Sequence, residues 1–214
     1  MKPWITVATD GALTLQQRGT EFALRSGGQV LMSSTQHDSE LAMANEGLRG
    51  LERESPRVLI GGLGMGYTVR ATLDRLPAKS QVMVAELSKA VVEWNRGVLA
   101  PLAGNPLADP RVEVRVGDIR EVVKREGRFD AILLDVDNGP QALGGTSNSG
   151  LYTNKGLAAF REAMRPRGCL VVWSAGPDED FPARMEKAGF NVRITRPSAR
   201  GTGKSRHVLF VGRT

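Results

Sequence analysis

Hydrophobic and polar residues follow two different rhythms along the chain, and the rhythm changes near residue 57. Before that position, short stretches of alternating apolar and polar residues are separated by the turn dipeptides Asp10-Gly11 and Gly27-Gly28. Alternation with a period of two is typical of strands that bury one face, and Asp-Gly favours a hairpin turn. We therefore predict about four short strands that form a small antiparallel β flap over residues 1–36.

A helix is predicted next, over residues 39–51, because apolar residues recur there at helical spacing and Ser39 is a suitable N-cap. From residue 57 onward, apolar strands alternate with helical segments. The predicted strands cover residues 58–60, 82–85, 112–116, 131–134 and 169–173, and the predicted helices cover residues 67–76, 89–99, 119–125 and 181–188. Continuous apolar strands that alternate with helices are typical of a parallel sheet with both faces covered.

The last two predicted strands, residues 190–195 and 207–211, leave no room for a helix between them. They should form an antiparallel hairpin at the edge of the sheet, since a parallel pair needs a crossover connection. The overall prediction is an α/β fold. Residues 37–214 form a doubly wound, mostly parallel, Rossmann-like sheet, and the β flap precedes it.

Composition narrows the class of protein. The 214 residues are 41% hydrophobic and 24% charged, and no apolar run approaches the ~18 residues of a membrane-spanning helix, so a globular protein is indicated and no membrane partner is expected. The chain reaches polar Asp10 too early for a secretory signal, which predicts a cytoplasmic location. One cysteine, Cys169, excludes an internal disulfide. No metal is expected, because one cysteine and two histidines do not make a usual zinc site.

The net charge of +6 arises in the C-terminal part of the chain. Six basic residues and no acidic residue follow Phe190, so the preceding chain holds 23 basic and 23 acidic residues. Because the charge is local and aromatic residues are only 5%, nucleic acid is not an expected partner. In and beside the loop 197–205, Arg200, Lys204 and Arg206 either bind an anionic acceptor or keep an exposed edge strand from pairing.

A glycine-rich turn, Gly61-Gly62-Leu63-Gly64-Met65-Gly66, joins the first strand of the predicted parallel sheet to its helix. Glycines allow a positive φ there and let a ligand approach the backbone closely. The dinucleotide fingerprint GxGxxG needs a glycine where Tyr67 stands, which disfavours NAD and FAD. The turn therefore either binds another nucleoside or is simply a tight connection.

Carboxylates stand where the next two strands end. Glu86 follows the second strand, where it can accept hydrogen bonds from ribose hydroxyls, and Asp118 follows the third, where it can accept one from an adenine amino group. Either acid alone also fits a solvated surface group or a helix cap. Because the carboxyl ends of parallel strands meet in one crevice, the glycine turn and the two acids together predict a nucleoside site.

The most apolar strand, residues 131–134, runs directly into Asp135-Val136-Asp137-Asn138-Gly139-Pro140. Two carboxylates beside a buried strand are costly to hold together unless a cation offsets their charge. A sulfonium cofactor or an ammonium substrate is such a cation. The alternative is that Asp135 caps the following turn and Asp137 belongs to the bend before Pro140.

Together these motifs resemble the spermidine synthase-like group of the S-adenosylmethionine-dependent methyltransferase superfamily, and the resemblance covers most of the chain. It rests on Gly-Gly-Leu-Gly-Met-Gly, Val-Ala-Glu-Leu, Val-Gly-Asp-Ile, Leu-Leu-Asp-Val-Asp-Asn-Gly-Pro, Leu-Tyr before a helix, Arg-Pro-Arg-Gly-Cys-Leu-Val-Val-Trp and the N-terminal flap. It implies the Rossmann-like methyltransferase fold.

The resemblance also implies roles for individual residues. Gly62, Gly64 and Gly66 would line the cofactor, Glu86 its ribose, Asp118 with Ile119 its adenine, and Asp135 would take the position of the reactive aspartate. Candidates for substrate binding are Asp137, Tyr152, His37 and Glu40, although His37 and Glu40 also fit a hinge between flap and core, and Tyr152 also fits the core. The chain departs from the group's pattern in two places. Residues 36–42 contain no tyrosine, and one residue rather than two separates Asp135 from Asp137.

The function implied by the resemblance is that of a transferase whose cofactor is S-adenosylmethionine or decarboxylated S-adenosylmethionine. The leading reaction is aminopropyl transfer to an amine acceptor, as in polyamine biosynthesis, with Asp135 accepting the proton of the amine. One alternative is a methyltransferase that acts on a small, possibly anionic, molecule, and another is a nucleoside-binding module without turnover. A small-molecule acceptor and a second copy of the chain, in a homodimer, are the expected partners.

Overall fold

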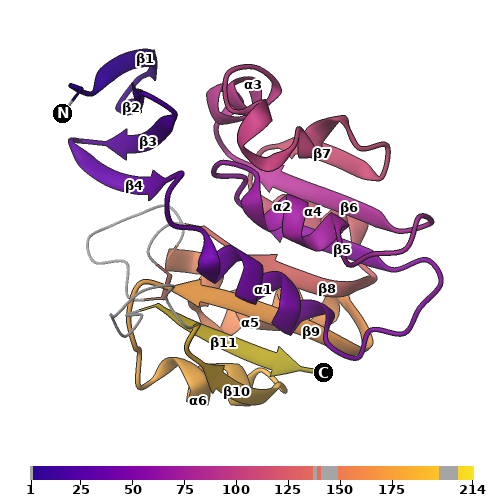
Figure 1. Cartoon of the computed structure of the whole chain (residues 1–214). Coiled ribbons are helices and arrows are strands. Elements are labelled where there is room, and N and C mark those ends of the chain that lie inside the picture. The colour runs from indigo at the N-terminus through magenta and orange to yellow at the C-terminus, as the bar shows by residue number, and fades with distance from the viewer. Residues whose placement is uncertain (1, 137–138, 141–148, 198–206) are drawn as a thin grey trace.

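A computed structural model describes residues 2–136, 139–140, 149–197 and 207–214 of the chain, and these residues form two β-sheets (Figure 1). The smaller sheet is N-terminal and antiparallel, with strand order β1-β2-β3-β4. Its strands are β1 (Ile5–Asp10), β2 (Leu13–Arg18), β3 (Glu21–Ser26) and β4 (Gln29–Ser33). The predicted antiparallel flap is confirmed as this N-terminal sheet.

The larger sheet has the strand order β10-β11-β9-β8-β5-β6-β7. Its strands are β5 (Arg57–Gly61), β6 (Gln81–Glu86), β7 (Val112–Val116), β8 (Phe129–Leu134), β9 (Met164–Ser174), β10 (Asn191–Thr195) and β11 (Val208–Arg213). Strands β5 to β9 pair in parallel, whereas β11 pairs antiparallel with both β9 and β10. The doubly wound, mostly parallel sheet with a terminal antiparallel hairpin is therefore confirmed.

Helices cover both faces of the larger sheet. One face carries α1 (Asp38–Leu48), α2 (Tyr67–Leu73) and α3 (Lys89–Arg96), and the other carries α4 (Ile119–Glu126), α5 (Asn154–Glu162) and α6 (Phe181–Lys187). In the connections that the structure describes lie three short 3₁₀ helices, namely η1 (Ala100–Ala103), η2 (Pro106–Ala108) and η3 (Ser149–Tyr152). In the described part of the chain, none of these helices is long and apolar enough to cross a membrane.

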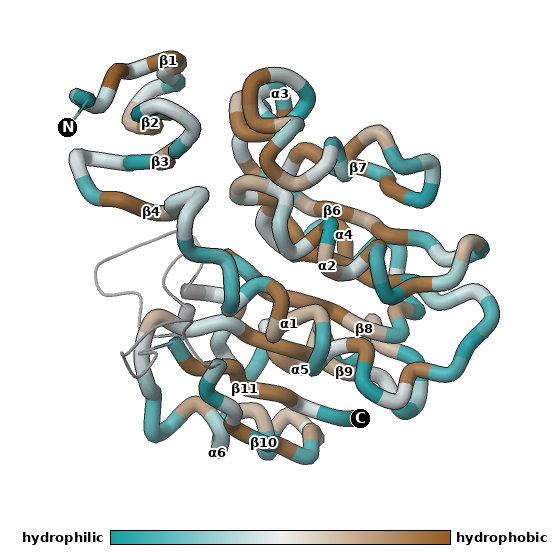
Figure 2. Tube along the Cα trace, viewed as in Figure 1, coloured by the Kyte–Doolittle hydropathy of each residue, from teal (hydrophilic) through white to brown (hydrophobic). Residues whose placement is uncertain are grey.

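The central strand β8 shows why the chain folds as three layers. All six of its residues are buried, and they alternate between the two faces of the sheet, so that Leu133 joins the core under α1 to α3 and Leu134 joins the core under α4 to α6. Hydrophobic residues run along the middle strands of the larger sheet in the same way (Figure 2). Helices on both faces therefore remove this apolar surface from water.

The strand order of the larger sheet determines where a ligand crevice lies. Strand β5 lies between β6 and β8, so the chain leaves β5 in one direction and later returns on its other side. The connections diverge at such a point and leave a crevice beyond the carboxyl ends of the strands. The N-terminal sheet lies beyond these strand ends (Figure 1). The fold therefore sets the N-terminal sheet over the predicted crevice.

Two sequence predictions are corrected in detail. The first helix spans Asp38–Leu48, one residue earlier than expected, and Ser39 is not its N-cap. The Ser39 hydroxyl instead donates to Oε2 of Glu40, at 2.6 Å, so it is not available to a backbone N–H of the helix. Strand β9 begins at Met164, five residues before the predicted start at residue 169, because Met164 itself pairs with Phe129 of β8.

Candidate functional site

A cavity of about 520 Å³ lies between the N-terminal sheet and the carboxyl ends of β5, β6, β7 and β8. The wall from the N-terminal sheet is apolar and consists largely of Leu13, Leu24, Val30, Leu31 and Met32. The acidic residues that line the cavity are Glu40, Glu86, Asp118 and Asp135. Among the described residues, no lysine or arginine lines it, so the cavity is suited to a ligand with an apolar body and positive charge.

The glycine turn after β5 forms part of the cavity floor through Gly62 and Gly64. Gly62 has a φ of +88°, and a Cβ at this position would lie 2.1 Å from the backbone oxygen of Asp135. Gly64 packs against Met32, whose sulfur would lie 2.6 Å from an added Cβ. Gly66 begins α2 but faces Pro106 and Asn95 rather than the cavity. The turn therefore brings two of the three predicted glycines to the site.

Glu86, at the end of β6, is held by the backbone of its surroundings. Its Oε2 accepts a hydrogen bond from the N–H of Leu63 in the glycine turn, and its Oε1 accepts one from the N–H of Ser88, each at 2.8 Å. These bonds fix the carboxylate at the cavity wall. Its role toward a ribose stays a prediction.

Asp118 caps the helix that follows β7. Its Oδ1 accepts from the N–H of Arg120 at 2.8 Å, and its Oδ2 accepts from the Arg120 side chain, with the Nε contact also at 2.8 Å. These hydrogen bonds from Arg120 lower the pKa of Asp118 below its ordinary value. Asp118 and the side chain of Ile119 both line the cavity. The helix cap and the predicted adenine contact are compatible, because a carboxylate accepts several hydrogen bonds.

Asp135 and Glu40 form the most perturbed pair of acids in the cavity. Asp135 follows β8, and Thr68 of α2 donates a hydrogen bond to its Oδ2 at 2.7 Å. Burial, and then the nearby charge of Glu40, raise the pKa of Asp135 to about 7, and the Thr68 bond partly offsets this rise. Burial also raises the pKa of Glu40, which is only 6% exposed. Two acids that approach in a poorly solvated place favour the binding of a proton or a cation.

His37, just before α1, and Tyr67, the first residue of α2, form an aromatic pair near Glu40. The rings of His37 and Tyr67 are stacked with centroids 4.3 Å apart, and the Tyr67 hydroxyl donates to the backbone oxygen of Ser34 at 3.2 Å. Burial, and then Glu40, raise the pKa of Tyr67. His37 therefore supports the junction between the N-terminal sheet and α1, and it does not itself line the cavity.

Not every predicted substrate residue lies at the cavity. Tyr152 is 5% exposed, and its hydroxyl donates to the backbone oxygen of Val136 at 3.2 Å while its ring packs edge-on against Phe181. It supports the segment after β8 from within the core, which is the alternative that the sequence left open. Asp137 lies outside the described residues, as do Arg200, Lys204 and Arg206 of the basic loop.

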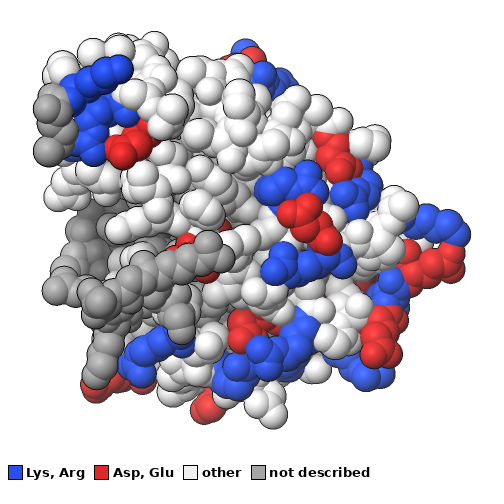
Figure 3. Space-filling view, in the orientation of Figure 1, with Lys and Arg blue, Asp and Glu red and all other residues white. Residues whose placement is uncertain are grey.

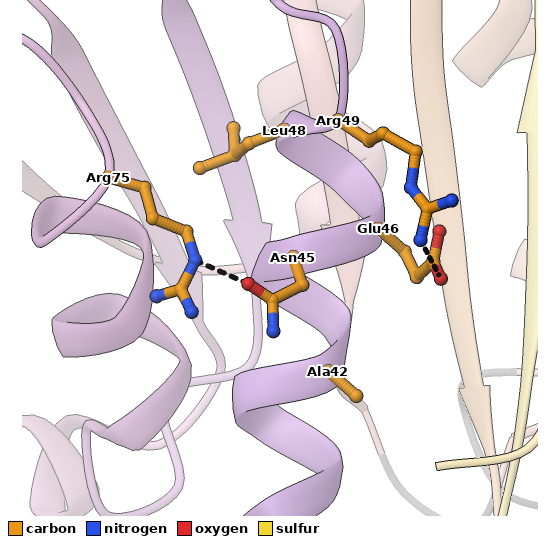
Figure 4. Close-up of a pocket in the computed structure, with 6 residues that line it drawn as sticks. All are labelled: Ala42, Asn45, Glu46, Leu48, Arg49 and Arg75. Carbon is orange, nitrogen blue, oxygen red and sulfur yellow. Dashed lines mark hydrogen bonds and ion pairs between the residues drawn. The ribbon is translucent and has the colours of Figure 1, made fainter.

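A second hollow, of about 500 Å³, lies on the outer side of α1 and faces α2 (Figure 4). Its polar side chains bond to one another: Arg75 donates to Asn45 at 2.6 Å, and Arg49 pairs with Glu46 at 2.9 Å. Arg193 of β10 also pairs with Glu46. Basic and acidic side chains are interspersed over this face of the molecule (Figure 3). The bonds of Arg75 and Arg193 join α1 to the chain after α2 and to β10, and α1 carries Glu40, whose charge acts on Asp135.

No family model matches the chain. The chain is 33% identical over 123 residues to the polyamine aminopropyltransferase of Thermoanaerobacter sp. (strain X514), a match that covers 56% of this chain and 41% of the relative. It is 30% identical over 148 residues to the polyamine aminopropyltransferase of Pyrobaculum calidifontis, covering 67% of this chain and 50% of the relative. The chain is a distant homologue of the polyamine aminopropyltransferases.

This aminopropyltransferase homologue spans about half the length of the curated relatives it matches. Its fold agrees with the crystal structure of spermidine synthase from Thermotoga maritima, with a TM-score of 0.75, 18% sequence identity, and coverage of 98% of this chain and 72% of that chain. The predicted resemblance to the spermidine synthase-like group is therefore confirmed for the fold and for distant homology.

Two residues of the chain support the site from behind its lining although no motif marks them. Thr68 bonds to Asp135, and Tyr67 stacks on His37 and lies near enough to Glu40 for that acid to raise the pKa of Tyr67. In the sequence, Tyr67 attracts notice only because it replaces a glycine of the dinucleotide fingerprint. Tyr67 also supplies a tyrosine between the N-terminal sheet and the larger sheet, where residues 36–42 have none. The sequence of residues 36–42 does not indicate this tyrosine, because Tyr67 belongs to α2 and reaches His37 only in the folded chain.

Proposed function

We propose that the chain transfers an aminopropyl group from decarboxylated S-adenosylmethionine to an amine acceptor. The observation that carries this proposal is the charge of the cavity: four acids line it, and no lysine or arginine among the described residues does. The decarboxylated cofactor carries a sulfonium and an ammonium and has no carboxylate. Intact S-adenosylmethionine would bring a carboxylate towards Glu40 and Asp135, where no lysine or arginine of the described residues lines the cavity to pair with it, and this is unfavourable.

In this proposal the nucleoside lies over β5, β6 and β7, where Gly62, Glu86 and Asp118 line the cavity. The ribose hydroxyls donate to Glu86, and the adenine amino group donates to Asp118 beside Ile119. The sulfonium and the aminopropyl chain then lie near Asp135, because β8 is the neighbour of β5 on the other side. The apolar residues of the N-terminal sheet cover the ligand and exclude water.

The reaction is a displacement at carbon. The amine nitrogen forms a bond to the aminopropyl carbon next to sulfur, the carbon–sulfur bond breaks with its electron pair going to sulfur, and the neutral thioether leaves. The amine must first lose a proton, and only about one molecule in ~2,500 is neutral at pH 7 for a pKa near ~10.4, which amounts to roughly 4.6 kcal/mol. Asp135 accepts this proton, and its raised pKa of about 7 makes it a better base than an ordinary aspartate.

The pH dependence of the reaction follows from Asp135. Because the carboxylate must be unprotonated to act as a base, kcat/KM should rise through about pH 7 as Asp135 loses its proton. Thr68→Val removes the hydrogen bond that lowers the pKa, so the midpoint of this rise should move up by about one pH unit. A pH series of kcat/KM for the two proteins measures the shift.

Thr72→Val is the matched control, because Thr72 lies on the same helix with a buried hydroxyl that has no hydrogen-bond partner among the described residues. Its midpoint should equal that of the wild-type protein. An unchanged midpoint in Thr68→Val would contradict the role assigned to the Thr68–Asp135 bond.

Calorimetry on nucleoside-free protein tests the proposed cofactor. The decarboxylated cofactor should bind at least about tenfold more tightly than S-adenosylmethionine, since one unpaired carboxylate near two acids costs about 1.4 kcal/mol or more. A preference for S-adenosylmethionine would favour the alternative of methyl transfer to a small molecule. Binding without any turnover would favour the second alternative, a nucleoside-binding module. The homodimer and the cytoplasmic location stay predictions.

A further inference from the structure

Glu40 is an acid of the cavity to which the proposed reaction gives no task of its own. It lies in the first turn of α1, is 6% exposed and lines the cavity. The Ser39 hydroxyl donates to its Oε2 at 2.6 Å, which helps to fix the carboxylate. Its negative charge acts on Tyr67 at the start of α2 and on Asp135 after β8. Glu40 therefore lies near both the glycine turn that precedes α2 and the end of β8.

The surroundings of Glu40 favour a positive partner. Burial raises the pKa of Glu40, the Ser39 bond offsets part of this rise, and the charge of Asp38 on the same helix adds to it. A buried carboxylate is stabilised in its charged form by a cation close to it. A cationic group of a ligand in the cavity would therefore bind favourably at Glu40.

The direction of the proposed displacement determines where the acceptor lies. The nucleoside lies over β5, β6 and β7, so the sulfur lies between the ribose and Asp135. The amine must approach the reacting carbon from the side opposite the sulfur, since nucleophile, carbon and leaving group have to be aligned. In that direction the cavity continues across β9 and β11, where Trp173 and His207 line it. The acceptor is therefore expected along the row of strand ends, beyond Asp135.

The remainder of the aminopropyl chain leaves this line. The reacting carbon is tetrahedral, so the next carbon of the chain lies at an angle to the sulfur–carbon bond. Four bonds of about 1.5 Å place the ammonium roughly 5 Å from the sulfur when the chain is extended. Glu40 comes from α1, which packs on β8 and β9 over one face of the larger sheet, rather than from a strand end. This acid therefore approaches from the side of the line of attack.

We propose that Glu40 binds the ammonium of the aminopropyl chain, while Asp135 remains available to accept the proton of the incoming amine. This inference rests on the proposed aminopropyl transfer and assigns to it a residue that determines cofactor specificity. An ammonium bonded to Asp135 would lower the pKa of that acid and make it a poorer base. At Glu40 the same ammonium offsets a charge that the proton transfer does not use. Burial, the largest cause of the raised pKa of Asp135, is unchanged by this pairing.

Calorimetry with two sulfonium ligands isolates the effect of the ammonium. We would titrate decarboxylated S-adenosylmethionine and 5′-deoxy-5′-dimethylsulfonioadenosine into the full chain. Both carry the nucleoside and the sulfonium, but only the first carries the aminopropyl chain. We expect the wild-type chain to bind the decarboxylated cofactor at least about tenfold more tightly than the dimethylsulfonium analogue.

The variant Glu40→Gln should reduce this ratio of affinities to less than about threefold, because an amide cannot offset the charge of the ammonium. Its affinity for the dimethylsulfonium analogue should stay within about threefold of the wild-type value, which also shows that the variant is folded. Ser39→Ala removes the 2.6 Å hydrogen bond but keeps the acid, so the ratio should fall by only about two- to fivefold.

Glu86→Gln is the matched control, because it makes the same change from acid to amide in the same cavity, at the proposed ribose position. It should weaken the binding of both ligands alike and keep the ratio of their affinities within about threefold of the wild-type ratio. A ratio that falls as far in Glu86→Gln as in Glu40→Gln would overturn the inference, since the loss would then reflect the overall charge of the cavity.

The possible results separate this inference from the proposed function. An unchanged ratio in Glu40→Gln overturns the inference, even if the decarboxylated cofactor is turned over. An unchanged ratio together with a raised KM for 1,4-diaminobutane would place Glu40 at the acceptor instead. A ratio that depends on Glu40, without release of methylthioadenosine in the presence of 1,4-diaminobutane, supports the ammonium site and counts only against the proposed transfer to that amine.

Discussion

Asp135→Asn should lower kcat for aminopropyl transfer by about 10²- to 10⁴-fold, the usual loss when a positioned general base is removed. The asparagine keeps the size of the side chain, and its oxygen can still accept the hydrogen bond from Thr68. It cannot accept the proton of the amine at neutral pH. Release of methylthioadenosine from decarboxylated S-adenosylmethionine, measured with a saturating amine, checks the loss.

The same substitution should leave the nucleoside affinity nearly unchanged, because Glu86 and Asp118 lie over other strands. Asp74→Asn is a suitable control, since Asp74 lies at the end of α2 with a side chain that is 57% exposed and is not part of the cavity. It should keep wild-type kcat. Equal product formation by wild type and Asp135→Asn would remove Asp135 from the mechanism.

Stability gives an independent measure of the environment of Asp135. Its pKa is about 7 in the folded chain and 3.8 in the unfolded reference. Between pH 3.8 and about pH 7 the folded state binds this proton more tightly than the unfolded state does. Protonated Asp135 therefore contributes to the stability of the fold at low pH, and this contribution is lost as the pH rises through about 7. Asp135→Asn should therefore gain stability relative to wild type as pH rises from 4 to 8, by at most about 4 kcal/mol. Urea denaturation at several pH values measures the difference.

Gly62→Ala should destabilise the fold by about 2–5 kcal/mol and abolish nucleoside binding, for two reasons that add. A residue with a Cβ is strained at the φ of +88°, and the new Cβ would lie 2.1 Å from the backbone oxygen of Asp135. To relieve this contact, the end of β8 must move away from the glycine turn. The substitution therefore displaces Asp135 from Thr68 as well as narrowing the cavity floor.

The variant Gly28→Ala separates the effect of backbone strain from the effect of the close contact. Gly28 has a similar φ of +83°, but no heavy atom lies within 4 Å of an added Cβ. It should lose only the backbone-strain part, about 1–2 kcal/mol, and should keep its affinity for the nucleoside. Urea denaturation and calorimetry on both variants make the comparison. Similar losses in the two would show that the close approach of Gly62 to Asp135 is not what requires glycine there.

Much of the fold was predictable from the sequence because the signals are local. Before residue 34, apolar and polar residues alternate, which is typical of a half-exposed antiparallel sheet. Continuous apolar runs such as β8 are instead typical of a buried parallel sheet. The helix boundaries were harder to predict. Ser39 was expected to cap α1, but its hydroxyl bonds to Glu40 and the helix already begins at Asp38.

The residues of the candidate site were also only partly predictable from the sequence. Gly62, Glu86, Asp118 and Asp135 could be located by counting, because each follows a strand and the carboxyl ends of parallel strands converge. Tyr152 could not be assigned between core and site, since an aromatic residue before a helix fits both. The structure places it in the core, against Phe181.

The sequence by itself determined the α/β class, the flap and the end of each strand that carries an acid or a glycine, since spacing along the chain specifies all of these. The tertiary structure alone decided which side chains meet across elements. Thr68 reaches Asp135 from 67 positions away, Glu40 lies near enough to raise its pKa, and Trp173 meets His207 at the far end of the cavity. Such contacts depend on the docking of α1 and α2 and on strand register, and burial, rather than residue type, sets the chemistry of Asp135.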